Sequence, residues 1–508
     1  MKLFVKKSIQ QLLATSKEGE HTLKRTLGAG NLIALGIGAI IGAGLFVRTA
    51  AAAGGNAGSA VTISFIIAAI GCAFAGLCYA EFASIIPIAG SAYTYAYATM
   101  GEIIAWIIGW ALILEYALGA ATVSISWSEY ANNLLGHRIP YEWCHSPMES
   151  ILTNGVSHHG IINLPALIIL LLLSLLLIKG TQESATVNSV IVIVKVAIVL
   201  VFIAIGWQFI NPANHTPYMI PADAKPVKLP DGTMYSFSSF FTHGWGGVVR
   251  GAGIVFFAFI GFDAVSTAAQ EAKNPKKDMP IGILGSLVIC TILYVVFSWV
   301  LTGVAPYTDF MKAGKEASVA YAISHYMAGY AWLSTLVTVA ILAGFSSVIL
   351  VMLLGQSRVF YTMSTDGLLP KVFSDLHPKF STPYKSNIIL FIFVGLFAAF
   401  LPESVAGDLT SIGTLFAFVV VCVGVMILRK KDPNLVRPFK TPFVPLVPIL
   451  GILICAGMII SLPGRTQLSA LAWMVFGLVI YFAYSRKKSK LGNVGDILPT
   501  ASDFEKLD

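Results

Sequence analysis

Long apolar stretches recur along the whole chain, and most approach the twenty or so residues that cross a lipid bilayer as a helix. They predict about twelve membrane-spanning helices, near residues 29–53, 58–80, 102–130, 163–180, 187–209, 246–270, 281–304, 330–364, 385–401, 405–429, 445–462 and 468–485. The pattern is typical of an all-α integral membrane protein.

The first of these stretches is interrupted by glycines. Gly36–Phe46 carries four of them, and each Gly costs about 1 kcal/mol of helix propensity relative to Ala. We interpret Gly42-Ala43-Gly44 as a place where the helix opens, because open backbone at membrane depth is tolerated where it lines a cavity. The alternative is close helix packing through small residues, for which Gly38 and Gly42 have the GxxxG spacing.

The sixth stretch has a comparable interruption around Phe257–Asp263, with Gly261 and Asp263 where a simple span would have neither. A charge at mid-depth costs about 2.5–3.5 kcal/mol, so Asp263 should face protein or water. Helices one and six are five helices apart and cross the membrane in opposite directions. Interrupted helices at corresponding positions of two halves indicate an inverted-repeat transporter.

The two interruptions suggest complementary chemistry. Opening helix one exposes backbone N–H groups at the start of its outer half, which favour a carboxylate; the residues concerned are Ile41, Gly42, Ala43 and Gly44. Opening helix six, over Phe257, Ala258, Phe259 and Ile260, exposes carbonyls that can accept from an ammonium group. Phe257, Phe259 and parts of helices three and eight would wall a side-chain pocket there. Together they would recognise the part that all α-amino acids share.

Composition and charge agree with a membrane protein. The chain is 56% hydrophobic and 11% charged, with a mean hydropathy of +0.79. Its net charge of +8 comes from Lys and Arg in loops on one side, which by the positive-inside rule places both termini in the cytoplasm. The six cysteines form no disulfide or metal pattern. We expect no metal, no cofactor and no nucleic-acid partner.

The same reading divides the chain into six parts. We predict a cytoplasmic leader (1–28), a first five-helix repeat (29–210), an extracytoplasmic loop (211–245), a second five-helix repeat (246–430), two additional helices (431–485) and a cytoplasmic tail (486–508).

Three ionisable residues within the spans are candidates for coupling transport to an ion. Lys195 lies far from either end of its helix, so it should face inward; burial favours proton loss from a lysine, and its proton could be tied to substrate binding. The alternative is a structural lysine that caps carbonyls. Glu115 and Asp263 are expected in the same polar interior, with or without Lys195.

Two arginines lie on the outer side of the proposed site. Arg48 follows Gly44 by four residues, and Arg250 precedes the opening of helix six. In an outer vestibule they would disfavour cationic substrates, which predicts a preference for neutral amino acids. The alternative is that they face headgroups or pair with loop carboxylates.

Several motifs resemble the amino acid–polyamine–organocation (APC) superfamily, in particular its cationic amino acid transporter branch and related bacterial permeases. They are Gly36–Phe46, Gly76-Leu77-Cys78-Tyr79-Ala80-Glu81-Phe82, Gly90-Ser91-Ala92-Tyr93, Phe257–Asp263 and Asp366-Gly367-Leu368-Leu369-Pro370. The resemblance implies a 5+5 inverted repeat (LeuT-like) with discontinuous helices 1 and 6, two C-terminal helices, and alternating access.

The resemblance also implies roles for individual residues. The substrate carboxylate would meet Ile41 to Gly44, and its amine the carbonyls of Phe257, Ala258 and Ile260. Many relatives have Thr or Ser where this chain has Ala43, so one carboxylate contact is missing here. In some proton-coupled relatives a lysine like Lys195 reaches the opened part of helix one.

We therefore predict a secondary transporter of L-α-amino acids in the plasma (inner) membrane, coupled to protons and preferring neutral side chains. A cationic amino acid transporter, an exchanger and a non-transporting sensor are the alternatives. The spans lack the residue sets of an intramembrane enzyme, and we see no channel filter or charge ring. The expected partners are the substrate and the bilayer; a small accessory membrane subunit is left open.

Overall fold

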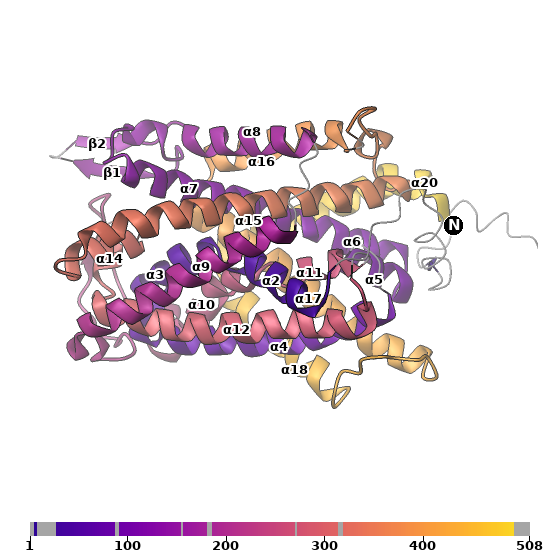
Figure 1. Ribbon diagram of the computed structural model, residues 1–508, viewed down its shortest axis with the longest axis horizontal. Coiled ribbons are helices and arrows are strands. Elements are labelled where there is room, and N and C mark those ends of the chain that lie inside the picture. The colour runs from indigo at the N-terminus through magenta and orange to yellow at the C-terminus, as the bar shows by residue number, and fades with distance from the viewer. Residues whose placement is uncertain are drawn as a thin grey trace, which may run out of the picture.

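The computed structural model describes residues 5–7, 27–86, 91–153, 156–179, 185–269, 272–312, 318–380 and 382–491. Most of the predicted leader, the carboxyl-terminal part of the predicted tail and Gly90 lie outside these ranges. The described chain is a bundle of helices, most of which run along one common axis (Figure 1).

The helices in chain order are α2 (Ala29–Ile40), α3 (Thr49–Ala52), α4 (Val61–Ile85), α5 (Ser91–Thr99), α6 (Glu102–Ile113), α7 (Gly119–Leu134), α8 (Leu164–Lys179), α9 (Ala185–Gly206), α10 (Gly244–Val255), α11 (Ala264–Thr267), α12 (Pro275–Val304), α13 (Asp309–Lys312), α14 (Ser318–Tyr326), α15 (Ala331–Thr365), α16 (Tyr384–Phe400), α17 (Glu403–Lys431), α18 (Leu446–Ser461), α19 (Gly464–Ile480) and α20 (Arg486–Lys488).

Every apolar range predicted from the sequence contains helix. Among the described residues, seven helical stretches are long and apolar enough to cross a membrane, namely Gly44–Ile85, Glu102–Leu134, Val190–Phe209, Pro275–Val304, Ala331–Thr365, Glu403–Lys431 and Gly464–Lys488. Shorter apolar helices, such as α2, α8 and α16, fill the remaining predicted ranges.

The bundle is apolar outside and partly polar inside. On α8 and α16, exposed apolar residues recur every three or four positions, as expected for one helix face; they are Ile168, Leu172, Leu175, Ile388, Ile392 and Leu396. Charged side chains lie buried within the bundle, among them Arg48, Glu81, Glu115, Lys195 and Asp263. This arrangement suits a protein surrounded by lipid, in which intramembrane charges face protein.

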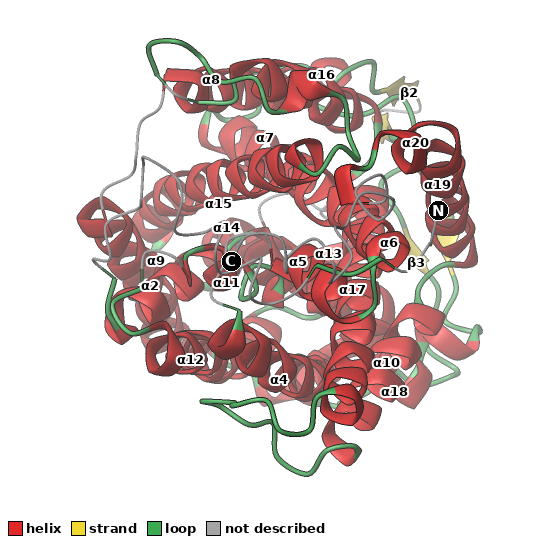
Figure 2. Ribbon diagram, turned by 90° about the vertical axis from the view of Figure 1, so that its right-hand side faces the viewer, coloured by secondary structure: helices red, strands yellow, loops and turns green. Residues whose placement is uncertain are grey.

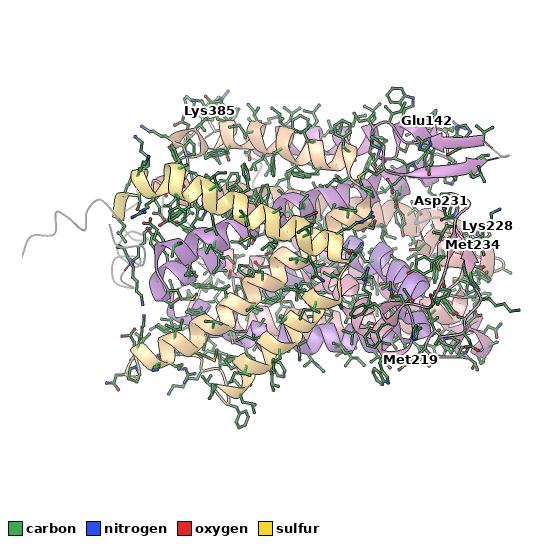
Figure 3. The ribbon with its side chains drawn as sticks, turned by 180° about the vertical axis from the view of Figure 1, so that it is seen from behind. Glu142, Met219, Lys228, Asp231, Met234 and Lys385 are labelled. Carbon is green, nitrogen blue, oxygen red and sulfur yellow. The ribbon has the colours of Figure 1, made fainter. Side chains whose placement is uncertain are left out.

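Short strands occur in two loop regions. β1 (Ser150–Thr153) pairs antiparallel with β2 (Val156–His159), and β3 (Val227–Lys228) pairs with β4 (Met234–Tyr235). Residues of these loops, including Glu142, Lys228 and Met234, lie at the end of the bundle opposite Lys385 (Figure 3).

The interrupted helices lie in the interior of the bundle. In the view along the bundle, α11 and α5 are near the centre, with α12 and α4 on one side and α15 on the other (Figure 2). α12 packs against both α2 and α4, and α15 packs against α7 and α9. Long continuous helices therefore surround the short and broken ones.

Candidate functional site

The first predicted helix is broken where its glycines indicated. α2 ends at Ile40, Ile41 adopts an extended conformation, and a π-helical turn begins at Gly44. The first amides to bond back after the break are those of Leu45 and Phe46, which donate to the carbonyl of Gly42 at 3.2 and 3.4 Å. The amides of Gly42 to Gly44 precede this ladder, as the first N–H groups of a helix do.

The second break follows α10. The helix tightens into a 3-10 turn over Phe256–Phe259, and Ile260 is then extended. Gly261 has a φ of +109°, a value that favours glycine, and a Cβ there would lie 3.0 Å from the carbonyl oxygen of Ala39. This glycine therefore both turns the chain and lets it pass the end of α2.

The two breaks lie against each other. A Cβ at Gly44 would overlap the backbone of Ala258, so the two helices are in direct backbone contact there. The Tyr294 hydroxyl, from α12, lies 3.0 Å from the carbonyl oxygens of both Ile40 and Ala258, and its single proton can be donated to either. The structure thus brings Ile41–Gly44 together with Phe257–Ile260.

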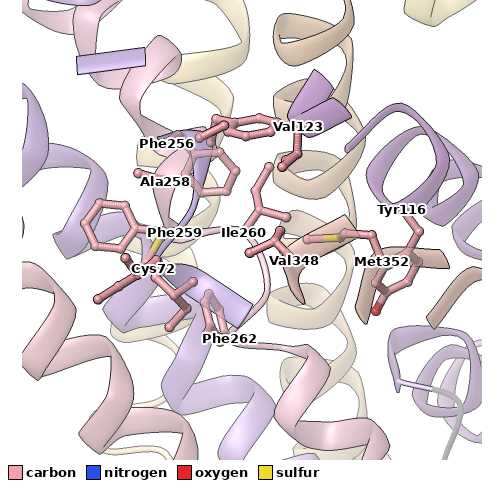
Figure 4. Close-up of a cluster of buried hydrophobic side chains, with 14 of the residues drawn as sticks. Cys72, Tyr116, Val123, Phe256, Ala258, Phe259, Ile260, Phe262, Val348 and Met352 are labelled. Carbon is pink, nitrogen blue, oxygen red and sulfur yellow. The ribbon is translucent and has the colours of Figure 1, made fainter. Parts of the chain in front are cut away.

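Apolar side chains surround the second break. Figure 4 shows Ile260 directed toward Val348 and Met352 of α15, with Val123 of α7 nearby. Val348 also covers the first break, because a Cβ at Gly42 would lie 3.1 Å from its Cγ2. α7 and α15 lie in the third and eighth predicted helices, parts of which were expected to wall the pocket. The sequence did not indicate which of their residues do so, because these look like ordinary apolar residues of a span.

The two phenylalanines predicted as pocket walls have separate surroundings. Phe259 packs against Phe65 and Tyr294, with ring centroids 6.2 and 5.3 Å away. Phe257 lies below the guanidinium of Arg48, with 5.9 Å between the Arg48 Cζ and the ring centroid. Phe259 therefore belongs to the packing around α12, whereas Phe257 borders Arg48.

Lys195 reaches from α9 to the last turn of α2, just before the first break. Its side chain is 2% exposed, and its Nζ donates to the carbonyl of Gly38 at 2.7 Å. Its aliphatic part runs along Gly344 of α15, where a Cβ would lie 3.0 Å from the lysine Cε. One ammonium group therefore joins α9 to the last turn of α2.

Asp263 and Glu115 form a second polar cluster. Both side chains are fully buried, and the two carboxyl groups are neighbours. The Tyr116 hydroxyl donates to Asp263 Oδ2 at 3.1 Å, and the Ser91 hydroxyl at 3.4 Å. Asp263 directly follows the second break, so this cluster anchors the chain that leaves it.

The two arginines are held by protein groups. Arg48 is 1% exposed, forms an ion pair with Asp408 and lies 3.5 Å from Glu403. Arg250 donates to the carbonyl of Ser461 at 3.0 Å. The alternative of pairing with carboxylates therefore describes Arg48, and its neutralised charge gives no support to the expected repulsion of cationic substrates.

A helical bundle with two opened helices in its interior is typical of membrane transport proteins. The family model for amino acid permeases matches residues 27–484, and the chain belongs to that family. It is 45% identical to the branched-chain amino acid permease BcaP of Bacillus subtilis and 41% identical to the methylthioribose transporter of the same organism, each match covering 96% of this chain and 99% of the relative. It is 32% identical to the vacuolar cationic amino acid transporter 4 of Arabidopsis thaliana, over 84% of this chain and 67% of the relative.

Proposed function

We propose that this permease moves L-α-amino acids with neutral, apolar side chains by alternating access. The observation that carries the proposal is the apposition of the two breaks. The amides of Gly42–Gly44 precede the helical ladder, and this stretch lies against the turn Phe256–Phe259 that ends the helix before the second break. Helix ends of this kind favour a carboxylate on one side and an ammonium group on the other.

The neutral preference rests on the side chains beside the breaks. Ile260, Val123, Val348 and Met352 are apolar, and a charged side chain placed among them would lose its hydration without gaining a partner. The relative named for branched-chain amino acids is consistent with such lining. Arg48 does not contribute to this preference, because its charge is already paired with Asp408.

Proton coupling is proposed through Lys195. While charged, the ammonium bonds the carbonyl of Gly38, three residues before the break at Ile41. Loss of that proton would weaken the bond between α9 and α2. It would also alter the end of α2, which borders the backbone amides proposed to bind the substrate. The Asp263–Glu115 cluster would contribute a second set of protonatable groups at the other break.

The proposal includes an architecture. We infer twelve spans arranged as a 5+5 inverted repeat followed by two helices, in the plasma membrane with both termini cytoplasmic. Breaks in α2 and after α10, five predicted helices apart, support the repeat. The excess of Lys and Arg in the loops predicted as cytoplasmic supports the orientation.

The test is uptake of labelled leucine into proteoliposomes that contain the full chain. We expect saturable uptake, faster when the outside is more acidic and indifferent to sodium, with strong competition from isoleucine and valine and weak competition from arginine. Competition by arginine as strong as that by valine would contradict the neutral preference. Absence of uptake together with saturable binding would indicate a sensor.

Methylthioribose belongs in the same competition series, because a close relative carries that name. This compound has neither a carboxylate nor an ammonium group for the two sets of backbone groups. We therefore expect it to leave leucine uptake unchanged, and strong competition by it would overturn the assignment of the breaks as an amino acid site.

A further inference from the structure

A short amino-terminal segment is docked on the end of the bundle where α6 begins. The amide of Glu102 donates to the carbonyl of Val5 at 3.0 Å. Lys7 forms an ion pair with Asp366, and its Nζ lies 4.9 Å from the centroid of the Tyr97 ring. These contacts on both sides fix the position of the intervening residue, Lys6.

Lys6 is held next to another lysine. Its ammonium group lies close to that of Lys431, the last residue of α17. Partial burial and the proximity of Lys431 lower the pKa of Lys6 to about 8, and Asp432 is the acidic group that acts in the opposite direction. Lys430 is exposed beside the pair. The surface around Lys6 and Lys431 therefore carries more positive than negative charge.

The segment that follows Lys431 exposes apolar side chains among these cations. Val436 is 82% exposed and Phe443 is 79% exposed, which makes them the two most exposed of the large hydrophobic residues described. Lys440 is exposed between them. In Figure 1 the segment leading into α18 extends sideways from the bundle.

This segment is firmly attached to the bundle. The amide of Thr441 donates to Glu81 Oε2 of α4 at 2.8 Å, and Arg429 bonds both oxygens of that carboxylate at 2.8 and 2.9 Å. Arg437 donates to the carbonyls of Leu435 and Asp432 at 2.8 and 2.7 Å. The exposure of Val436 and Phe443 is thus imposed by a fixed backbone.

We propose that Lys6, Lys431 and the segment 432–446 bind the phosphate headgroup of an anionic phospholipid. The two ammonium groups provide paired donors for one phosphate, and Lys430 and Lys440 add to the attraction. Val436 and Phe443 enter the same leaflet as that lipid, in the way that aromatic and aliphatic side chains anchor an interfacial segment.

The bound headgroup has a structural consequence. Because it neutralises the repulsion between Lys6 and Lys431, it holds the amino-terminal segment on Asp366 and on the start of α6. The bond from the Glu102 amide to Val5 is the reporter of this docking. The proposal does not depend on which substrate the permease carries.

The test is native mass spectrometry of the full chain in detergent with added phosphatidylglycerol or phosphatidylcholine. We expect retention of phosphatidylglycerol in preference to phosphatidylcholine, and about fivefold weaker retention in Lys6→Gln and in Lys431→Gln, from the usual contribution of one lysine near an anionic surface. Lys431→Arg keeps the charge and should retain the lipid. Lys371→Gln, which removes another exposed lysine, is the matched control.

A second measurement follows the docking itself. Hydrogen–deuterium exchange at the Glu102 amide should slow when phosphatidylglycerol is added to the wild type, and should not respond in Lys431→Gln. Equal loss of lipid in Lys371→Gln would mean diffuse attraction to a basic surface and would overturn the proposal. Displacement of the lipid by millimolar inorganic phosphate, or an equal effect of phosphate on Glu102, would assign the pair to a free anion and would also overturn it.

Discussion

The two breaks require glycine for different reasons. Gly261 is needed for its positive φ, whereas Gly44 is needed because its backbone touches the backbone of Ala258. For the first break the sequence left two alternatives, an opening at Gly42–Gly44 and close packing through Gly38 and Gly42. The structure has the opening, together with close packing at Gly44. The helix opens at Ile41 and Gly42, and it packs two residues later at Gly44.

Gly44→Ala should therefore disturb both stability and transport. The added Cβ meets backbone that cannot rotate away, and overpacking of this kind costs on the order of 1–3 kcal/mol. We expect a lower thermal unfolding temperature in detergent and reduced leucine uptake. Gly457→Ala in α18 is the control, since a Cβ there has no neighbour within 4 Å; an equal loss of stability in both variants would refute the packing role of Gly44.

The proposed role of Lys195 in proton coupling can be tested by substitution. We expect Lys195→Gln to bind leucine and exchange it across the membrane, but to lose the acceleration by an inward proton gradient, because the amide cannot take up or release a proton. Uptake and counterflow in the same proteoliposomes separate these two properties. Persistent stimulation by acid outside would show that Lys195 is the structural lysine of the alternative hypothesis.

Gly344→Ala provides an independent check on the same side chain. The new Cβ would lie 3.0 Å from Lys195 Cε and would displace the lysine from the carbonyl of Gly38 without removing its charge. We expect this variant to weaken proton stimulation as well, measured in the same uptake assay. Unchanged coupling in Gly344→Ala would indicate that the charge of Lys195 matters and its bond to Gly38 does not.

Among the elements, α12 has a role that its sequence did not reveal. Through Tyr294 it lies at hydrogen-bonding distance from the last carbonyl of α2 and from a carbonyl of the 3-10 turn after α10. One side chain of a continuous helix therefore spans the ends of both broken helices. Its hydroxyl can therefore hold the two breaks in a fixed position relative to each other.

Tyr294→Phe tests this function while preserving the ring. Loss of the hydroxyl leaves carbonyls unpaired in a buried place, which costs about 1 kcal/mol for an ordinary hydrogen bond. We expect a lower unfolding temperature and a higher KM for leucine. Tyr330→Phe, in which the ring keeps its contact with Phe209, should change neither. An unaltered KM in Tyr294→Phe would show that the breaks hold their positions without α12.

The sequence was sufficient to locate the helices and both breaks. Continuous apolar runs have few structural alternatives to helix in a membrane, and glycine with a carboxylate in such a run is costly enough to mark an exception. The resemblance implied a lysine that reaches the opened part of helix one, and Lys195 bonds the carbonyl of Gly38, in the last turn of α2 next to that part. These inferences depend on the local sequence pattern, on the rule that charged side chains within the membrane face protein and not lipid, or on the resemblance to a known family.

Contacts between distant segments were beyond the same reasoning. Arg48 and Asp408 are 360 residues apart, and the choice between an open vestibule and an ion pair depends on how helices meet. Parts of helix eight were expected at the pocket, but Val348 and Met352, which border Ile260, resemble the lipid-facing residues of any span. Periodicity does not distinguish a face directed at a site from a face directed at lipid when both are apolar.

At the scale of the whole molecule, the motif Asp366–Pro370 connects the two described ends of the chain. Asp366 pairs through its side chain with Lys7, and its carbonyl accepts from the amide of Lys490 at 3.1 Å. The hydroxyl of Ser485 donates to the carbonyl of Leu368 at 2.6 Å. The turn after α15 is therefore the point where the amino-terminal and carboxyl-terminal segments meet the bundle.

Gly367 makes this meeting sterically feasible. Its φ is +83°, and a Cβ would overlap the carbonyl oxygen of Lys488. Gly367→Ala should strain the turn by about 1–2 kcal/mol and push the carboxyl-terminal segment away. The measurement is hydrogen–deuterium exchange at the Lys490 amide, which should become faster because its bond to the carbonyl of Asp366 is lost.

The control for this experiment is Gly464→Ala at the start of α19, where a Cβ has no neighbour within 4 Å and exchange at Lys490 should stay slow. Leucine uptake measured on the same two variants then shows whether the attachment matters for transport. Because α5 and α6 also contact the terminal segments through Tyr97 and Glu102, release of the carboxyl-terminal segment should loosen this end of the bundle and change the uptake rate. Faster exchange with an unchanged rate would mean that the attachment stabilises the fold and leaves transport unaffected.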